Sequence, residues 1–286
     1  MLRCLMIMGG LALSALYSAA SAELRGRVLE VIPEEQVLRV ELSVVEEADA
    51  GDLSAGDTVD FRVSENNIEI GYGGRTIRGK ARLQDGNLHL DRIFPLDGDG
   101  ARALKDVNRK LREATATKSR REYVREGEYI PDFALIDQDG RFVQARQLQG
   151  KPFMLNFIFT RCAMPTMCPA STERMAKMQD QAREAGLDDL HFVTITFDPD
   201  FDSPAILRQY AEGYDIEPEN YRLLTSASPK VIDDLLEQFG ILTREEDGTI
   251  NHTMATLLVD KNGRVAHRKE GSQWEVEAFL EEARDL

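Results

Sequence analysis

The chain has 286 residues, of which 42% are hydrophobic, and its formal net charge is -15. This apolar content is enough to build packed cores, so the composition excludes a globally disordered chain. The negative charge argues against nonspecific binding to nucleic acid or to anionic lipid, because both are polyanions. Domains usually have about 100–200 residues, so the length predicts two of them.

The segment 1–22 is typical of a secretory signal peptide. Arg3 supplies a positive charge, the run from Leu5 to Ala19 is apolar, and Ala20-Ser21-Ala22 offers small residues at a cleavage site. This order predicts cleavage after Ala22 and an exported, periplasmic protein. The alternative is an uncleaved segment that anchors the chain in the inner membrane, although the apolar run is short for a span of about 20 residues.

Export limits the cysteines that a mature chain keeps. Cys4 lies in the signal, which leaves Cys162 and Cys168. Two thiols close in sequence form a disulfide bond in an oxidising compartment unless a reductant or a metal prevents it. So few cysteines exclude a scaffold held together by disulfides, and we interpret the pair as chemical.

The segment 23–96 is rich in β-branched residues and in short alternations of polar and apolar side chains. The predicted strands are Arg25–Val31, Gln36–Val44, Asp57–Val63, Asn67–Tyr72, Thr76–Leu83 and Asn87–Ile93. Such short strands favour a small, all-β, OB-like barrel. The segment has no cysteine and no methionine, and its one histidine, His89, alternates with leucines. We therefore place His89 on a solvated strand face and predict no site here.

The segment 97–128 changes in composition. It opens with the flexible run Asp97-Gly98-Asp99-Gly100, after which Leu104, Val107 and Leu111 recur at helical spacing among many basic residues. The pattern predicts a basic amphipathic connector helix. We interpret it as a solvated linker that packs one narrow stripe, and the alternative is a docking surface for an acidic partner.

From residue 129 to residue 286 strands and helices alternate. Predicted strands are Phe133–Ile136, Arg141–Gln144, Phe153–Thr160, His191–Phe197, Thr253–Asp260 and Gly263–Arg268. Predicted helices are Pro169–Glu184, Pro204–Tyr214, Pro229–Phe239 and Gln273–Arg284. The order predicts a mixed sheet with helices on both faces, which is the thioredoxin arrangement. We expect a fragment that starts near Gly127 to fold alone.

The cysteine pair follows the central predicted strand and precedes a helix. The amide groups and dipole at a helix N-terminus stabilise anions, so we expect a lowered thiol pKa there, with both sulfurs reactive and near solvent. Pro169 fits the first turn of a helix, where no N–H donor is needed. The competing interpretation is an inert structural disulfide between Cys162 and Cys168.

Two further segments carry candidate side chains. His252 stands just before a predicted strand, where a histidine is more often a surface residue than a functional one. The run Asp198-Pro199-Asp200-Phe201-Asp202-Ser203-Pro204 follows another strand. Its three carboxylates could bind a hard cation, but we prefer Asp202 or Ser203 as the cap of the next helix.

These motifs together resemble the Sco/SenC family of thioredoxin-like copper chaperones. The matching features are Pro131-Asp132-Phe133, Gly150-Lys151-Pro152, Phe159-Thr160-Arg161-Cys162, Cys168-Pro169, Asp198-Pro199, Ser203-Pro204, His252 and Asp260-Lys261-Asn262-Gly263. The resemblance implies copper, Cu(I) or Cu(II), bound by two cysteines and one histidine. At the matching positions these are Cys162, Cys168 and His252.

The chain departs from the family pattern in two ways. The family usually has three residues between its cysteines, whereas five stand here, and they include Met164 and Met167, whose thioethers would suit Cu(I). We favour ordinary loop or core positions for both. The barrel faintly resembles small copper-binding barrels but lacks their methionine and histidine ligands, which suggests a degenerate or docking module.

Two functions from different classes remain. The resemblance implies an assembly factor that delivers copper to the copper-site subunit of cytochrome c oxidase or maintains its thiols. The alternative is an enzyme, a thiol-disulfide oxidoreductase in which Cys162 and Cys168 are catalytic and no metal takes part. Its partner would be another exported thiol protein. A peroxiredoxin is disfavoured, because Phe159 and Pro165 occupy the places three residues from Cys162 where its chemistry needs threonine.

Overall fold

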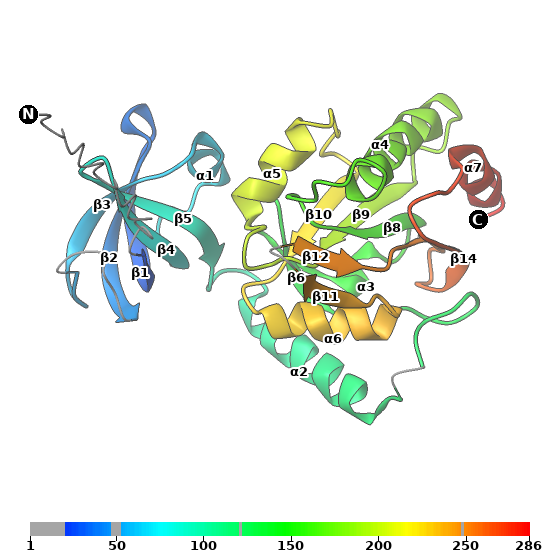
Figure 1. Ribbon diagram of the computed structural model, residues 1–286, viewed down its shortest axis with the longest axis horizontal. Coiled ribbons are helices and arrows are strands. Elements are labelled where there is room, and N and C mark those ends of the chain that lie inside the picture. The colour runs from blue at the N-terminus through cyan, green and yellow to red at the C-terminus, as the bar shows by residue number, and fades with distance from the viewer. Residues whose placement is uncertain (1–20, 47–52, 120–121, 247–248) are drawn as a thin grey trace, which may run out of the picture.

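The computed structural model describes residues 21–46, 53–119, 122–246 and 249–286. A β-barrel precedes a larger α/β domain (Figure 1). Most of the predicted signal, Cys4 included, lies outside the described residues. Its last two positions, Ser21 and Ala22, are described as the first residues of strand β1, and Ala22 is fully buried in the barrel.

The barrel closes in the strand order β1-β2-β3-β5-β4. Its elements are β1 (Ser21–Ile32), the 3₁₀ turn η1 (Pro33–Glu35), β2 (Val37–Glu46), β3 (Thr58–Arg62), helix α1 (Glu65–Ile70), β4 (Thr76–Gln84) and β5 (Asn87–Pro95). Leu24 and Val28 on β1 point into the core, whereas Arg25 and Arg27 are exposed. This period of two is what a half-buried strand requires. The predicted all-β barrel is confirmed.

One predicted strand of the barrel is wrong. The segment Asn67–Tyr72 begins within α1, which Ser64 precedes as N-cap residue, and Gly71 ends the helix at a φ of 72°. Isoleucines at 68 and 70 alternate as in a strand, but a serine before the helix and a glycine after it are the boundary signals of a short helix.

The α/β domain contains a mixed sheet in the order β14-β13-β8-β9-β10-β6-β7. The strands are β6 (Ala134–Asp137), β7 (Phe142–Gln144), β8 (Phe153–Ile158), β9 (His191–Thr196), β10 (Tyr221–Thr225), β13 (Ala255–Val259) and β14 (Val265–Glu270). A separate ribbon pairs β11 (Thr243–Glu246) with β12 (Thr249–His252). The pairings β8–β9 and β9–β10 are parallel, and the others in the sheet are antiparallel.

Helices cover both faces of this sheet, as predicted (Figure 1). They are α2 (Ala101–Thr117), α3 (Ala145–Leu148), α4 (Cys168–Glu184), α5 (Pro204–Glu212), α6 (Pro229–Phe239) and α7 (Val276–Arg284). Phe153, Leu155 and Phe157 of β8 join the core beneath α6, and Met154 joins the core beneath α4 and α7. Each such buried side chain contributes roughly 1.5–3 kcal/mol of transfer free energy. Within the described residues, no helix combines the length and apolar character needed to span a membrane.

The predicted connector helix is α2, and it packs against the α/β domain. Leu111 and Val124 both belong to the core beneath α6. Asn108 is buried, donates a hydrogen bond to the Ala134 carbonyl at 2.7 Å and accepts one from the Ala134 amide at 2.9 Å. The helix thus buries one narrow stripe, and that stripe is part of the domain that carries the cysteines.

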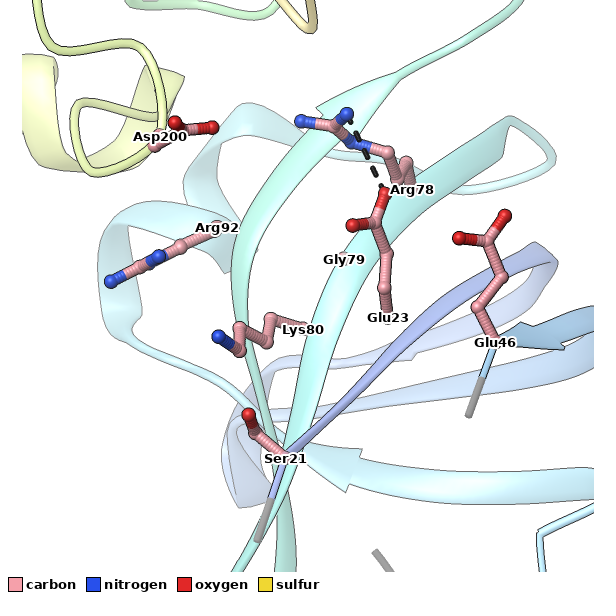
Figure 2. A pocket seen from close by; sticks show the side chains of 8 residues that line it. All are labelled: Ser21, Glu23, Glu46, Arg78, Gly79, Lys80, Arg92 and Asp200. Atoms are coloured by element: carbon pink, nitrogen blue, oxygen red, sulfur yellow. Dashed lines mark ion pairs between the residues drawn. The ribbon is translucent and has the colours of Figure 1, made fainter. Parts of the chain in front are cut away.

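Polar contacts join the barrel to the α/β domain. Arg208 of α5 forms ion pairs with Glu69 of the barrel at 2.6 Å and with Asp139 at 2.9 Å. A cavity of 640 Å³ near this junction has Asp200 on one side and the barrel residues of Figure 2 on the other, including an ion pair of 3.5 Å between Arg78 and Glu23. Its lining contains no cysteine or histidine, so we place the candidate site elsewhere.

Candidate metal centre

The cysteine pair lies in the loop between β8 and α4, where the sequence places it. β8 ends at Ile158, and α4 begins at Cys168, with Pro169 in its first turn. Both thiols are free; Cys168 is fully buried, whereas Cys162 is partly exposed. Cys162 packs against the same core and keeps some exposure, so the expectation that both sulfurs lie near solvent is wrong for Cys168.

His252 approaches the buried sulfur from the end of β12. Its Nε2 atom lies 3.5 Å from Cys168 Sγ, and its Nδ1 atom lies 2.9 Å from the carbonyl oxygen of Ile250. A carbonyl only accepts hydrogen bonds, so Nδ1 carries the proton and the Nε2 lone pair faces the sulfur. Metal-binding histidines are commonly oriented by such a bond from the second ring nitrogen.

Aromatic rings hold the imidazole in place. The ring centroid of Phe197 lies 4.6 Å from that of His252, and the Phe159 ring meets it edge-on at 5.5 Å. Only 9% of the His252 surface is exposed. These contacts shield the Cys168–His252 pair from water, and they come from the strand ends of β8 and β9.

The buried environment sets the charge state of the pair. Burial raises the pKa of the Cys168 thiol, and the neighbouring Cys162 raises it further, while burial lowers the pKa of His252. The expectation of a lowered pKa at this helix N-terminus is therefore wrong for Cys168, because desolvation of the thiolate outweighs the helix dipole. A neutral thiol and a neutral imidazole face each other, and a bound cation would displace the thiol proton.

The third predicted ligand lies beside Cys168 without completing the set. Cys162 is near enough to act on the pKa of Cys168, and its Sγ atom lies 4.0 Å from the Met164 carbonyl oxygen. Among the described residues, no group of three or more histidine, cysteine, aspartate or glutamate side chains is arranged to hold one metal ion. Two thiols and one imidazole fit copper chemically, and Cys162 lies close enough to the Cys168 thiol to act on its pKa.

The two methionines of the loop occupy different surroundings. Met164 is 57% exposed, and Met167 packs partly buried against the core beneath α6. These are the loop and core positions that the sequence favours for them. Neither placement by itself makes a thioether ligand.

Asp202 secures the start of the cysteine loop. Its carboxylate accepts hydrogen bonds from the Thr160 amide at 3.1 Å and from the hydroxyls of Thr160 and Thr196. Of the two expected caps, Ser203 is the N-cap residue of α5, although its side chain makes no cap hydrogen bond, whereas Asp202 bonds the cysteine loop and does not cap the helix. Burial raises the pKa of Asp202 to about 6. Sequence reasoning missed this clamp, although the carboxylates follow a buried strand beside the cysteine strand.

Asp198 holds the next residue of the loop. It accepts a hydrogen bond of 2.5 Å from Arg161 Nε. The Arg161 guanidinium also lies 5.2 Å from the centroid of the Phe201 ring, and Arg92 of the barrel lies 5.7 Å from that centroid. Phe201 therefore links the barrel to the residue that precedes Cys162. No described residues near these carboxylates form a cation site of three or more acidic or histidine side chains.

The α/β domain is similar in sequence and in fold to known proteins. The chain is 28% identical over 139 residues to the SCO1 protein homolog of Bacillus subtilis, covering 48% of this chain and 70% of that protein. A SCO1/SenC family lipoprotein from Bacillus anthracis matches with a TM-score of 0.52 and 29% identity, over 56% of this chain and 95% of that one. Arabidopsis thaliana ScoI, solved with copper bound, matches with a TM-score of 0.50 and 24% identity, over 56% of this chain and 100% of that one.

These solved structures confirm the predicted thioredoxin-like fold of the α/β domain. The family match covers the cysteine loop and β12, and leaves the barrel without a family. The SCO1/SenC family profile matches residues 121–285, which is more than half of the chain. The chain therefore belongs to the SCO1/SenC family.

Proposed function

We propose that this protein binds copper through Cys162, Cys168 and His252 and serves in assembly of the copper centre of cytochrome c oxidase. The observation that supports it most is the Nε2 lone pair of His252, which faces Cys168 Sγ at 3.5 Å. The relative from Arabidopsis thaliana is named for its bound copper, and its fold is shared by this domain. Membership of the SCO1/SenC family supports the proposed role in oxidase assembly.

Each residue has a distinct task in this proposal. Cys168 and His252 are held in position by α4 and by the aromatic contacts, so they form the fixed part of the site. Cys162 would supply the second thiolate from its partly exposed position in the loop. Copper would supply a soft Lewis-acid centre for two thiolates and one imidazole, a donor set that suits Cu(I) and that also takes Cu(II) with further ligands.

A thiol-disulfide oxidoreductase is the second candidate, favoured by the unequal exposure of the two sulfurs. The partly exposed Cys162 thiolate would attack a substrate disulfide, forming a mixed disulfide and releasing one substrate thiolate. Cys168 would then attack Cys162 Sγ, which closes the Cys162–Cys168 disulfide and releases the second substrate thiol. The raised pKa of Cys168 lowers the thiolate fraction available for this second step.

The proposal includes export of the protein to the periplasm. Residues 1–22 have the order of a secretory signal, and the partner by family membership is the copper-site subunit of an oxidase that faces the periplasm. An uncleaved signal would hold the protein at the inner membrane. N-terminal sequencing of the protein from a periplasmic extract tests cleavage after Ala22.

Anaerobic copper titration of the reduced full chain tests the function. We expect one Cu(I) per chain in the wild type, and no stoichiometric binding in Cys162→Ser or Cys168→Ser. Disulfide reduction is measured on the same samples with insulin as substrate. An absence of stoichiometric copper together with rapid insulin reduction would reject the copper assignment and leave the oxidoreductase.

A further inference from the structure

An apolar groove runs beside α2, away from the cysteine loop. It has a volume of 420 Å³ and lies between α2, α6, the end of β5 and the β6–β7 hairpin. The two helices lie side by side below the sheet in Figure 1. Leu96, Leu104, Phe142 and Val231 line the groove, and each is only partly buried. The groove thus leaves apolar side chains without a full cover.

Cations border this groove on a protein that is otherwise acidic. Lys105, Arg109 and Arg112 of α2 and Lys230 of α6 all line it. Arg109 pairs with Glu113 at 2.8 Å, and Lys230 pairs with Asp234 at 3.3 Å. Within the part of the chain that the structure describes, Lys105 and Arg112 form no ion pair. The formal net charge of -15 makes this concentration of free positive charge a local exception.

The spacing of these cations predicts how the carboxylates of a complementary ligand would be arranged. Lys105, Arg109 and Arg112 stand at positions i, i+4 and i+7, so they share one face of α2 and extend over roughly 10 Å along its axis. A line of carboxylates at the same spacing occurs on one face of an acidic helix. The single headgroup of a fatty acid or lipid would meet one of these cations and leave the others unpaired.

We propose that this groove docks an acidic amphipathic helix of a partner protein. Leucine-sized side chains of that helix would cover Leu104, Phe142 and Val231, while its carboxylates would pair with Lys105 and Arg112. Helix-in-groove recognition of this kind uses apolar anchors at i, i+3 or i+4 and i+7. None of Cys162, Cys168 and His252 lines the groove, so the docking does not depend on the proposed copper site.

Peptide binding to the full-length protein tests this surface. The probe is a fluorescein-labelled helical peptide of about twelve residues with leucine on one face and glutamate beside it. We expect saturable binding by fluorescence anisotropy that weakens as salt is raised, because the ion pairs are exposed. The double variant Lys105→Glu/Arg112→Glu should bind about tenfold more weakly, since two exposed pairs become repulsive.

Matched controls separate docking from general electrostatics. Lys110→Glu changes an exposed charge of the same helix that does not line the groove, and it should leave binding unchanged. Leu104→Asn removes an apolar contact at a partly buried position and should weaken binding without unfolding, as circular dichroism checks. Equal binding of a peptide with lysine in place of glutamate would overturn the proposal. Binding of dodecanoate without binding of the peptide would also overturn it. So would a dimer in sedimentation experiments that Lys105→Glu/Arg112→Glu dissociates, because a second copy would then occupy the groove.

Discussion

The barrel and the α/β domain use their strands in different ways. In the barrel the strands close on one another, so their side chains fill one interior or face solvent. In the α/β domain the central strand β8 is buried on both faces and ends in a loop that carries Cys162. Its neighbour β9 ends beside the same loop, and β12 brings His252 to it. His89, by contrast, is a partly exposed residue of the barrel strand β5.

Histidine substitution in each region tests this contrast most strongly. His252→Ala should weaken copper binding by orders of magnitude, with the larger loss for Cu(II), which prefers nitrogen donors more than Cu(I) does. His89→Ala removes a partly exposed barrel histidine and should leave copper binding unchanged. Competition titration with a colorimetric chelator measures both affinities, and similar losses in the two variants would contradict the assignment of the site to the α/β domain.

Insulin reduction by the same two variants separates the candidate functions. Disulfide exchange depends on the thiolate fraction and on the leaving thiol, not on a metal-binding imidazole. We therefore expect any reductase activity of His252→Ala to stay close to that of the wild type. A large loss of this activity would show that His252 acts on the thiols themselves.

The boundary between the two regions can be located by shortening the chain. A fragment of residues 127–286 lacks Leu111 and Val124, which a fragment of residues 101–286 keeps in the core beneath α6. We expect the longer fragment to be more stable by about 2–5 kcal/mol, because the shorter one loses large buried side chains. Urea unfolding followed by circular dichroism compares them. Equal stability of the two fragments would show that α2 is a solvated linker that does not stabilise the domain.

The clamp at Asp202 predicts a pH effect confined to the α/β domain. Burial raises its pKa from 3.8 to about 6, so between these values the folded chain binds more protons than the unfolded chain. This carboxyl contributes stability at low pH that is lost as pH rises through about 6, and the total is about 3 kcal/mol. Asp202→Asn should remove that part of the pH dependence, as urea unfolding at pH 4 to 8 measures. If the free energy of unfolding depended on pH in the same way in the wild type and in Asp202→Asn, the assignment of this effect to Asp202 would be contradicted.

Continuous apolar runs made the central strands predictable, because a short run of apolar residues between turn signals is typical of a strand buried on both faces. The strand predicted at Phe153–Thr160 is an example, because β8 covers Phe153–Ile158. The helix predicted at Pro229–Phe239 is likewise confirmed as α6. The ribbon of β11 and β12 was missed, because its strands are short and polar. Asp247-Gly248 in the sequence between them is the turn signal that could have indicated it.

Part of the geometry of the candidate site was predictable from the sequence, but its charge state was not. The position of Cys168 at a helix start was correct, yet the depth of its burial depends on the core that it joins, which includes residues distant in sequence such as Leu235 and Leu257. Sequence spacing carries no information on desolvation, which here decides the pKa. The distance between Cys162 and the other ligands likewise depends on the conformation of a five-residue loop.

The smallest expected effect concerns the contact between the two regions. Arg92 of β5 reaches the Phe201 ring, and Phe201 in turn contacts Arg161, next to Cys162. A single exposed cation–π contact contributes about 0.5–1 kcal/mol, so Arg92→Gln should lower the free energy of unfolding by no more than that. Arg27→Gln, an exposed barrel position, is the matched control. Copper affinity should be equal in both variants, because Arg161 keeps its bond to Asp198 whether or not Arg92 is present. A weaker affinity in Arg92→Gln alone would show instead that the barrel acts on the cysteine loop through Phe201.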